Sequence, residues 1–143
     1  MKTNDINAFK GETKAAIQGW LARKVDEIFP NRPQTRVVAK NAINNGLNRM
    51  DERLNGYIDT LFLLFADESG TIDSTTLVDG VASLLDEMNP SEYEFGPLKT
   101  TVGKGEIAVR FPHNAFIEMI AGDLGGVKFT SSDIKEMKNY FNQ

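Results

Sequence analysis

Cysteine is absent from the chain of 143 residues, and histidine occurs once, at His113. The absence of cysteine excludes disulfides, thiolate metal sites and thiol nucleophiles. A zinc site would have to take most of its ligands from carboxylates, because only one imidazole is available. We therefore predict no metal and no cofactor, and the composition argues against redox and zinc enzymes.

Long apolar runs are also missing. The longest, residues 61–66, is far shorter than the roughly 20 residues that a membrane-spanning helix needs. The N-terminal segment has no apolar core behind its lysines, so it does not look like a secretory signal, and Asp5 and Glu12 argue against a transit peptide. We expect a cytoplasmic protein that does not span a membrane.

Basic residues are scarce in the middle of the chain. Residues 51–98 carry one Lys or Arg against eleven Asp or Glu, whereas residues 1–50 carry nine against four and residues 99–143 carry six against five. This asymmetry favours a helix pair, or a neighbouring subunit, that matches the two charge signs. A nucleic-acid surface with Trp20 as its stacking group is an alternative that we do not favour, because Trp20 falls in an apolar stripe. Its basic residues would be Lys10, Lys14, Arg23, Lys24, Arg32, Arg36, Lys40 and Arg49.

Apolar residues recur at steps of three and four along three N-terminal segments, which is the spacing of one helix face. They predict helices over residues 5–29, 35–66 and 73–88. Pro30 and Pro33 end the first helix, because proline lacks an amide donor and disfavours helical angles in the residue before it. These three helices are expected to pack antiparallel to one another.

The second predicted helix carries the clearest pattern in the chain, a heptad-like series with alternating steps of four and three. Such a series favours another helix as its partner. Asn44, Asn45 and Gly46 are poor helix formers and allow a kink or a break at that point. The partner-binding residues would be Ile43, Leu47, Met50, Leu54, Tyr57 and Leu61.

Turn residues dominate the segment 89–98, which we predict to be a loop, and residues 98–111 then alternate as a β-hairpin does. Gly103 and Gly105, on either side of Lys104, supply the positive φ angles of its tight turn. A short helix from 112 to 121, a strand at 127–129 and a terminal helix from Thr130 or Ser131 to 141 follow.

The predicted fold class is therefore α+β and predominantly helical, with three antiparallel N-terminal helices followed by a small β-β-α-β-α unit. We predict a single domain over residues 1–143, composed of a helical half, residues 1–90, and a small α+β half, residues 91–143.

The turn between the second and third predicted helices resembles part of an EF-hand calcium loop. The third, fifth, sixth, eighth and ninth loop positions are matched by Asp67, Ser69, Gly70, Ile72 and Asp73. Phe65 and Thr76 occupy the first and twelfth positions, where calcium needs anchoring oxygen ligands. Weak calcium binding at residues 65–76 is an alternative, and we favour a plain helix-turn-helix corner in which Gly70 forms the turn and Asp73 the cap.

No residue is predicted to be catalytic, and we predict that the protein is not an enzyme. The imidazole of His113 could act as a general base, but it lies at a strand-to-helix junction where a capping histidine is equally natural. The glycines at 103–105 and 122–126 do not satisfy the P-loop pattern. An alternative is a small ligand-binding or enzymatic α+β domain with a polar cleft near Arg110, His113, Asn114 and Asp123.

The function that we predict is a non-enzymatic protein-interaction or assembly module. It would act through the heptad-like helical surface, and its partner would be another protein or a second copy of the chain. The same apolar stripe could instead pack entirely inside the chain as part of its core. The sequence alone does not choose between a contact surface and an internal core.

Overall fold

The structure, a computed structural model, describes residues 1–142 and has an α+β fold that is mostly helical, as predicted. The chain forms two compact units. One contains Met1–Val78 and Glu136–Gln143, and the other contains Asp79–Lys135. The division into a helical half, 1–90, and an α+β half, 91–143, of a single domain stays a prediction.

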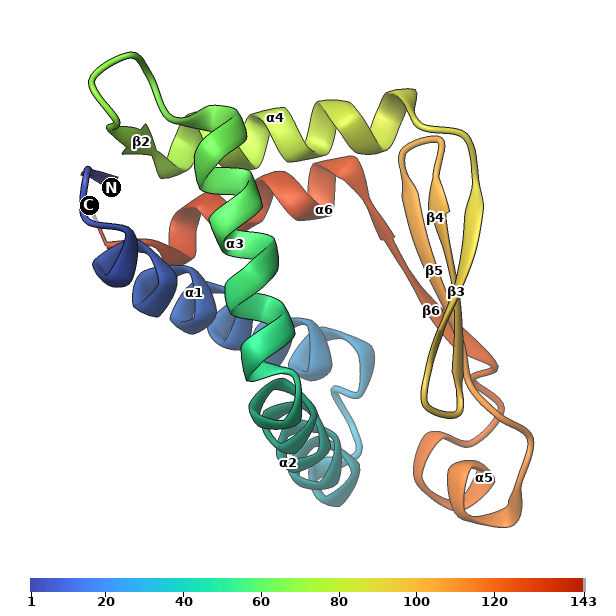
Figure 1. The fold of residues 1–143 in the computed structure, drawn as a ribbon. Helices are drawn as coiled ribbons and strands as arrows, with labels where there is room; N and C mark the ends of the chain where they lie inside the picture. The colour runs from blue at the N-terminus through green and yellow to red at the C-terminus, as the bar shows by residue number, and fades with distance from the viewer. Residues whose placement is uncertain (143) are drawn as a thin grey trace. The chain divides into compact units, whose positions relative to one another are not determined.

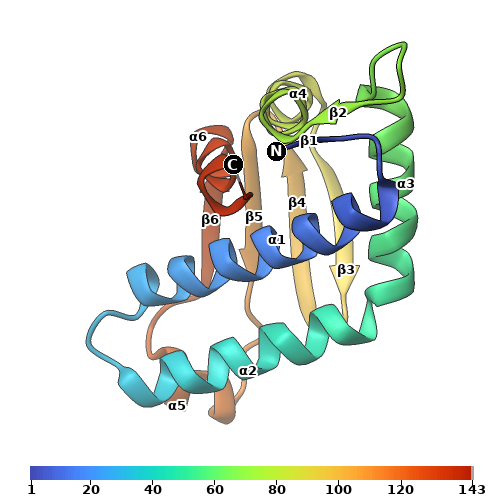
Figure 2. The same ribbon diagram turned by 90° about the vertical axis from the view of Figure 1, so that its left-hand side faces the viewer.

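The first unit is built around α1 (Ile6–Ile28), which packs against α2 (Pro33–Arg49), α3 (Asp51–Phe65) and the 3-10 helix η1 (Glu136–Tyr140). Figure 2 shows α1 and α2 lying side by side. The carboxylate of Asp5 caps α1 by accepting hydrogen bonds from the amides of Asn7 and Ala8, at 3.0 and 3.1 Å. The first predicted helix is therefore confirmed.

Three phenylalanines form the centre of this unit. Phe9 is fully buried; its ring meets the edge of Phe62 with the centroids 5.8 Å apart, and stacks on Phe141 at 6.3 Å. Trp20 is buried as well, as its place in the apolar stripe of the first helix predicted. The remaining buried apolar side chains of this unit are Ala16, Val25, Phe29, Ile58, Ile72, Leu77 and Val78.

The second predicted helix is divided in two, because the chain leaves helical geometry at Met50, where φ is −93° and ψ is 6°. The interruption that Asn44, Asn45 and Gly46 allowed is not observed, since α2 runs through all three. Arg49 ends α2, and Asp51 and Glu52 lie in the first turn of α3. A basic residue stabilises the C-terminal end of a helix and acidic residues stabilise the N-terminal end. The residues around Met50 therefore favour the end of one helix and the start of another.

Two short strands connect the ends of this unit. β1 (Lys2–Thr3) pairs antiparallel with β2 (Ile72–Asp73), which immediately precedes α4 (Ser74–Glu87). The N-terminal amine donates a hydrogen bond of 2.8 Å to the hydroxyl of Ser74.

Among residues 1–142, none of the helices has the length and the apolar character that crossing a membrane requires.

The second unit contains an antiparallel sheet of four strands in the order β3-β4-β5-β6, which Figure 2 shows side by side and Figure 1 shows nearly edge-on. The strands are β3 (Ser91–Phe95), β4 (Leu98–Gly103), β5 (Glu106–Arg110) and β6 (Gly126–Thr130). The prediction of a loop at 89–98 was wrong, because β3 occupies half of it. The alternation of Glu92 and Glu94 with Tyr93 and Phe95 is that of a strand.

The turn between β4 and β5 has the predicted backbone. Gly103, Lys104 and Gly105 have φ angles of 147°, 52° and 79°. A side chain at Gly103 would place its Cβ 2.7 Å from the backbone of Pro90, so glycine is required there for space as well as for its φ angle. The turn is held by two further backbone hydrogen bonds of 2.9 Å, from Lys104 to Met88 and from Gly105 to Leu85.

The last two α-helices begin at or near their predicted starts, at 115 and not 112 for the first of them and at 131 for the second. Asn114 caps α5 (Ala115–Ala121) through its side chain, and Gly122, with φ of 63°, ends that helix. Thr130 caps α6 (Ser131–Lys135): its hydroxyl accepts from the amide of Asp133 at 3.2 Å, while the Asp133 carboxylate accepts from the amide of Thr130 at 2.8 Å. The predicted strand at 127–129 is confirmed as part of β6.

The sheet has an apolar face and a charged face, because side chains opposite each other in the registers point the same way. On one face lie Tyr93, Phe95, Leu98, Thr100, Val102, Ile107, Val109, Val127 and Phe129. The charged side chains of the other face are Glu92, Glu94, Lys99, Glu106, Arg110 and Lys128.

Candidate functional site

The six residues of the predicted contact surface do not form one straight ridge. Ile43 and Leu47 lie on α2, Met50 lies at the bend, and Leu54, Tyr57 and Leu61 lie on α3. Five of the six are half-buried, and the exception is Tyr57, which is 58% exposed. Ile43 lines a cavity of about 320 Å³ together with Gln18, Gly19 and other residues of α1 and α2. Ile43 is therefore turned towards α1.

The most exposed apolar side chains of the first unit lie on the outward face of α3, beside the predicted series. Leu63 is 82% exposed and Leu64 is 67% exposed. Tyr57 and Leu64 are seven residues apart, so they lie on one helix face two turns, or roughly 10 Å, apart. The opposite face of α3 is packed through the buried side chains of Ile58 and Phe62. We call Tyr57, Leu63 and Leu64 the α3 surface.

The α3 surface is almost free of charge. From Leu54 to Ala66 the sequence has one ionisable acid or base besides tyrosine, Asp59. Its carboxylate lies 2.8 Å from the amine of Lys10 on α1, inside the unit. Sequence reasoning left out Leu63 because it does not follow the heptad spacing. The apolar run 61–66 was the available signal, since so many consecutive apolar residues cannot all lie on one narrow buried stripe.

The basic residues of the first fifty positions are largely engaged in ion pairs within the unit. Lys14 lies 2.9 Å from Asp51 and Lys40 lies 2.7 Å from Asp26. The hydrogen bond from Lys40 holds the pKa of Asp26 below its ordinary value, with the nearby charge of Lys40 and then of Arg36 acting in the same direction and desolvation opposing them. Binding of nucleic acid by these residues stays a prediction.

Among the basic residues of the first fifty positions, Lys24 is buried. Its amine lies 2.9 Å from Glu136 and 3.4 Å from Glu27, and 5.7 Å from the centre of the Trp20 ring. A buried ammonium requires such partners, because desolvation of an isolated charge is costly. The C-terminal segment is therefore joined to α1 by charge as well as by apolar packing.

The turn that resembles an EF-hand loop uses its first carboxylate internally. One oxygen of Asp67 accepts from the Ser69 hydroxyl at 2.6 Å and from the amides of Ser69 and Thr71 at 2.9 and 3.0 Å. The hydroxyl donor and then the Thr71 amide hold the pKa of Asp67 below its ordinary value. Gly70 has φ of 77°, and Asp73 accepts from the amide of Thr75 at 3.0 Å.

This arrangement is the one that a helix-turn-helix corner requires. Within residues 1–142, the structure contains no group of three or more His, Cys, Asp or Glu side chains suited to holding a metal ion. Weak calcium binding at residues 65–76 stays a prediction.

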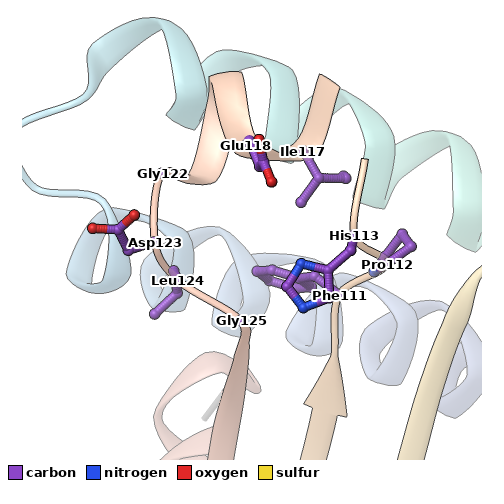
Figure 3. A pocket seen from close by; sticks show the side chains of 9 residues that line it. All are labelled: Phe111, Pro112, His113, Ile117, Glu118, Gly122, Asp123, Leu124 and Gly125. Carbon is purple, nitrogen blue, oxygen red and sulfur yellow. The ribbon is translucent and has the colours of Figure 1, made fainter. Parts of the chain in front are cut away.

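A cavity of about 290 Å³ lies beside His113 in the second unit (Figure 3). Ile117 and Glu118 reach it from α5, while Phe111, His113 and Leu124 come from the segments on either side of that helix. Glycines 122 and 125, Pro112 and Asp123 complete its lining.

Two of the four residues of the predicted polar cleft line this cavity, namely His113 and Asp123. Asn114 accepts from the Ile117 amide at 2.9 Å as the cap of α5, and Arg110 lies 3.4 Å from Glu92 across the sheet. Glu118 was not anticipated, because its position on a short helix gave no sign of what it would face. A ligand-binding or enzymatic function for this cleft stays a prediction.

Comparison with protein-family models, with curated proteins and with solved structures found no match to this chain. The arrangement of its own side chains is therefore the basis for any proposal about its function.

Proposed function

We propose that this protein is a non-enzymatic assembly module that forms a homodimer through the α3 surface. The observation that carries the proposal is the exposure of Leu63 and Leu64, at 82% and 67%, next to the exposed ring of Tyr57. Large apolar side chains gathered on one helix face are typical of a contact surface. The half-buried Leu54 and Leu61, from the predicted series, border this surface.

A second copy of the chain is the partner that the charges favour. Apolar, nearly uncharged helix faces can meet across a two-fold axis without bringing like charges together. Gly56 and Thr60 lie on the same side of α3 as the exposed side chains, and no atom lies within 4 Å of the position that a Cβ of Gly56 would take. A small residue at this position allows two helices to approach closely.

An antiparallel pairing of two α3 helices matches the residues at both ends. If Tyr57 of one copy lies against Leu64 of the other, Arg53 in the first turn of α3 lies near the turn that follows Phe65 of the second copy. That turn carries Glu68, and the same arrangement recurs across the axis. Both Arg53 and Glu68 are exposed. The apolar centre and the two flanking ion pairs together make the surface complementary to itself.

The test is the mass of the chain in solution, measured by light scattering after size exclusion. We expect the wild type to have twice the mass of one chain at high micromolar concentration and Leu64→Arg to have the mass of one chain. The side chain of Leu64 is mostly exposed, so this substitution should change the free energy of unfolding by about 0.5 kcal/mol or less. Leu84→Arg, at another exposed leucine, is the matched control and should remain dimeric.

Two results would contradict the proposal. The first is a wild-type chain that stays monomeric throughout the concentration range. The second is a Leu64→Arg chain that dimerises as well as the wild type does, which would leave the α3 surface without a role in assembly.

A further inference from the structure

Among residues 1–142, no strand pairs with the outer edge of β3. β3 is the first strand of the order β3-β4-β5-β6 and pairs with β4 alone, from Ser91 with Val102 to Phe95 with Leu98. All five of its residues are exposed. Within residues 1–142, Ser91–Phe95 make no backbone hydrogen bond outside this ladder. Alternate residues of an edge strand direct their amide and carbonyl groups outwards, where a further strand can bind them.

The side chains of β3 differ between its two faces. Tyr93 and Phe95, at 46% and 45% exposed, lie on the apolar face of the sheet, and Glu92 and Glu94 lie on the charged face. The strand has no lysine or proline, the residues that often protect an edge from pairing. Pro90 and Gly96 limit the available edge to these five residues.

The two glutamates decide which strand can be added. Two β3 strands paired antiparallel would bring Glu92 of one against Glu94 of the other, and like charges opposite each other destabilise a sheet. An added strand with basic side chains on the charged face and apolar ones on the other would meet complementary groups on both faces.

The opposite edge of the sheet shows the same alternation. In β6, Lys128 lies on the charged face between Val127 and Phe129 on the apolar face. β6 of a second copy fits β3 less well, because it offers one basic residue for two glutamates, of which Glu92 already lies 3.4 Å from Arg110 and Glu94 has no such ion pair among the described residues. The net charge of −4 also opposes bringing a second acidic chain to an acidic edge.

We infer that the outer edge of β3 binds an extended segment of a partner protein in which basic and apolar residues alternate. The segment adds a fifth strand to the sheet through main-chain hydrogen bonds to Ser91–Phe95, which is the β-augmentation mode of peptide recognition. Its basic side chains lie beside Glu92 and Glu94, and its apolar side chains lie beside Tyr93 and Phe95. This binding is separate from dimerisation, because it uses none of the α3 residues.

The probe is a synthetic seven-residue peptide, capped at both ends, in which lysine alternates with valine and phenylalanine. We expect its titration to shift the NMR amide signals of Ser91–Phe95 and to leave those of α3 unchanged. A peptide with glutamate in place of each lysine should bind at least about tenfold more weakly, because it loses both charge-assisted contacts. A lysine peptide N-methylated on alternate backbone nitrogens should also lose binding, because the donors of its ladder are removed.

Glu94→Lys is the matching change in the protein, and it should weaken binding of the lysine peptide about tenfold. Glu87→Lys, at an exposed glutamate of α4, makes the same change in net charge and should bind as the wild type does. The β4–β5 amide signals of both variants report that the sheet is folded.

Three results would overturn the inference. The first is a lysine peptide that does not bind, and the second is an N-methylated peptide that binds as well as the unmethylated one. The third is a fall in the mass of the protein in solution when Glu94→Lys is made, because this would mean that a second copy occupies the edge. The titration is repeated with Leu64→Arg, where the affinity should be unchanged. Failure of the peptide to bind therefore leaves the α3 dimer unaffected, and a monomeric wild type leaves the β3 edge unaffected.

Discussion

At the scale of single residues, Asp67 shows how hydrogen bonds to one carboxylate hold a short acidic turn. Its carboxylate accepts hydrogen bonds from the Ser69 hydroxyl and from the amides of Ser69 and Thr71. Acceptors of this kind are strongest when ionised, which is why the pKa of Asp67 lies below its ordinary value. We expect protonation of this carboxylate to weaken these hydrogen bonds.

The lowered pKa of Asp67 gives a pH dependence with a definite sign. The ionised form is favoured by folding, so its contribution to stability is present above the pKa that Asp67 has in the unfolded chain. That contribution is lost as the pH falls through the lowered pKa of the folded state. We expect Ser69→Ala, which removes the largest cause of the shift, to raise the pKa of Asp67 towards its ordinary value.

NMR titration of the Asp67 side-chain carbon measures this pKa directly. Unfolding curves at several acidic pH values should show a smaller loss of stability on acidification for Ser69→Ala than for the wild type. Thr60→Ala, which removes a hydroxyl donor to the Gly56 carbonyl on α3, serves as the control. An Asp67 pKa that does not rise in Ser69→Ala would show that the hydroxyl is not its cause.

At the scale of secondary structure, local signals gave most element boundaries. Thr130 or Ser131 was predicted to begin the terminal helix because each has a short hydroxyl side chain before an apolar helical pattern, and Thr130 is the cap observed. The β4–β5 turn was readable because Gly103 and Gly105 flank one residue between two alternating runs. In each of these cases the residues that decide the structure are neighbours in sequence.

The bend at Met50 and strand β3, which the sequence did not predict, depend on weaker or competing signals. The bend at Met50 comes from the charges of its neighbours, Arg49 and Asp51, and these compete with a heptad series that continues across it. Strand β3 is short, and the prolines and glycine around it are typical of loops. The conformation of β3 is determined by its pairing with β4, which is a tertiary contact and not a local sequence signal. The α3 surface was missed in part for the same reason, since burial is decided by which face packs on α1.

Two glycine substitutions should act in opposite directions. Gly103→Ala places a Cβ 2.7 Å from the backbone of Pro90 at a φ of 147°, and we expect it to destabilise the protein by at least about 2 kcal/mol. Gly11→Ala lies inside α1 with no atom within 4 Å of its new methyl group, and it should stabilise the protein by about 1 kcal/mol. Urea unfolding followed by circular dichroism gives both values. Equal effects of the two changes would mean that neither the contact with Pro90 nor helix propensity is the cause.

At the scale of the whole molecule, the uneven charge of the sequence is partly an internal match. The basic N-terminal part and the acidic middle part meet where Lys10 pairs with Asp59 and Lys14 with Asp51, and both pairs join α1 to α3. These pairs turn Asp51 and Asp59 towards α1, and the outward side of α3 from Leu54 to Phe65 carries no charge. The composition therefore contributes to the α3 surface, because charges that could have covered it are engaged elsewhere.

The proposed dimer makes a further prediction about Arg53 and Glu68, which meet only if the two α3 helices run antiparallel. Arg53→Glu should weaken dimerisation by roughly threefold to tenfold, because each copy then opposes an acid to an acid at both ends of the contact. Adding Glu68→Arg in the same chain restores opposite charges at both ends and should recover most of the affinity. Sedimentation at several protein concentrations gives the dissociation constants.

The salt dependence of dimerisation tests whether the effect of Arg53→Glu is electrostatic. The difference between Arg53→Glu and the wild type should shrink as salt is raised, because exposed charges are screened over about 8 Å at physiological ionic strength and over less above it. Lys104→Glu makes the same charge change in the β4–β5 turn and should dimerise as the wild type does. A double swap that dimerises no better than Arg53→Glu would exclude the antiparallel pairing, even if Leu64→Arg had shown that the α3 surface is the contact.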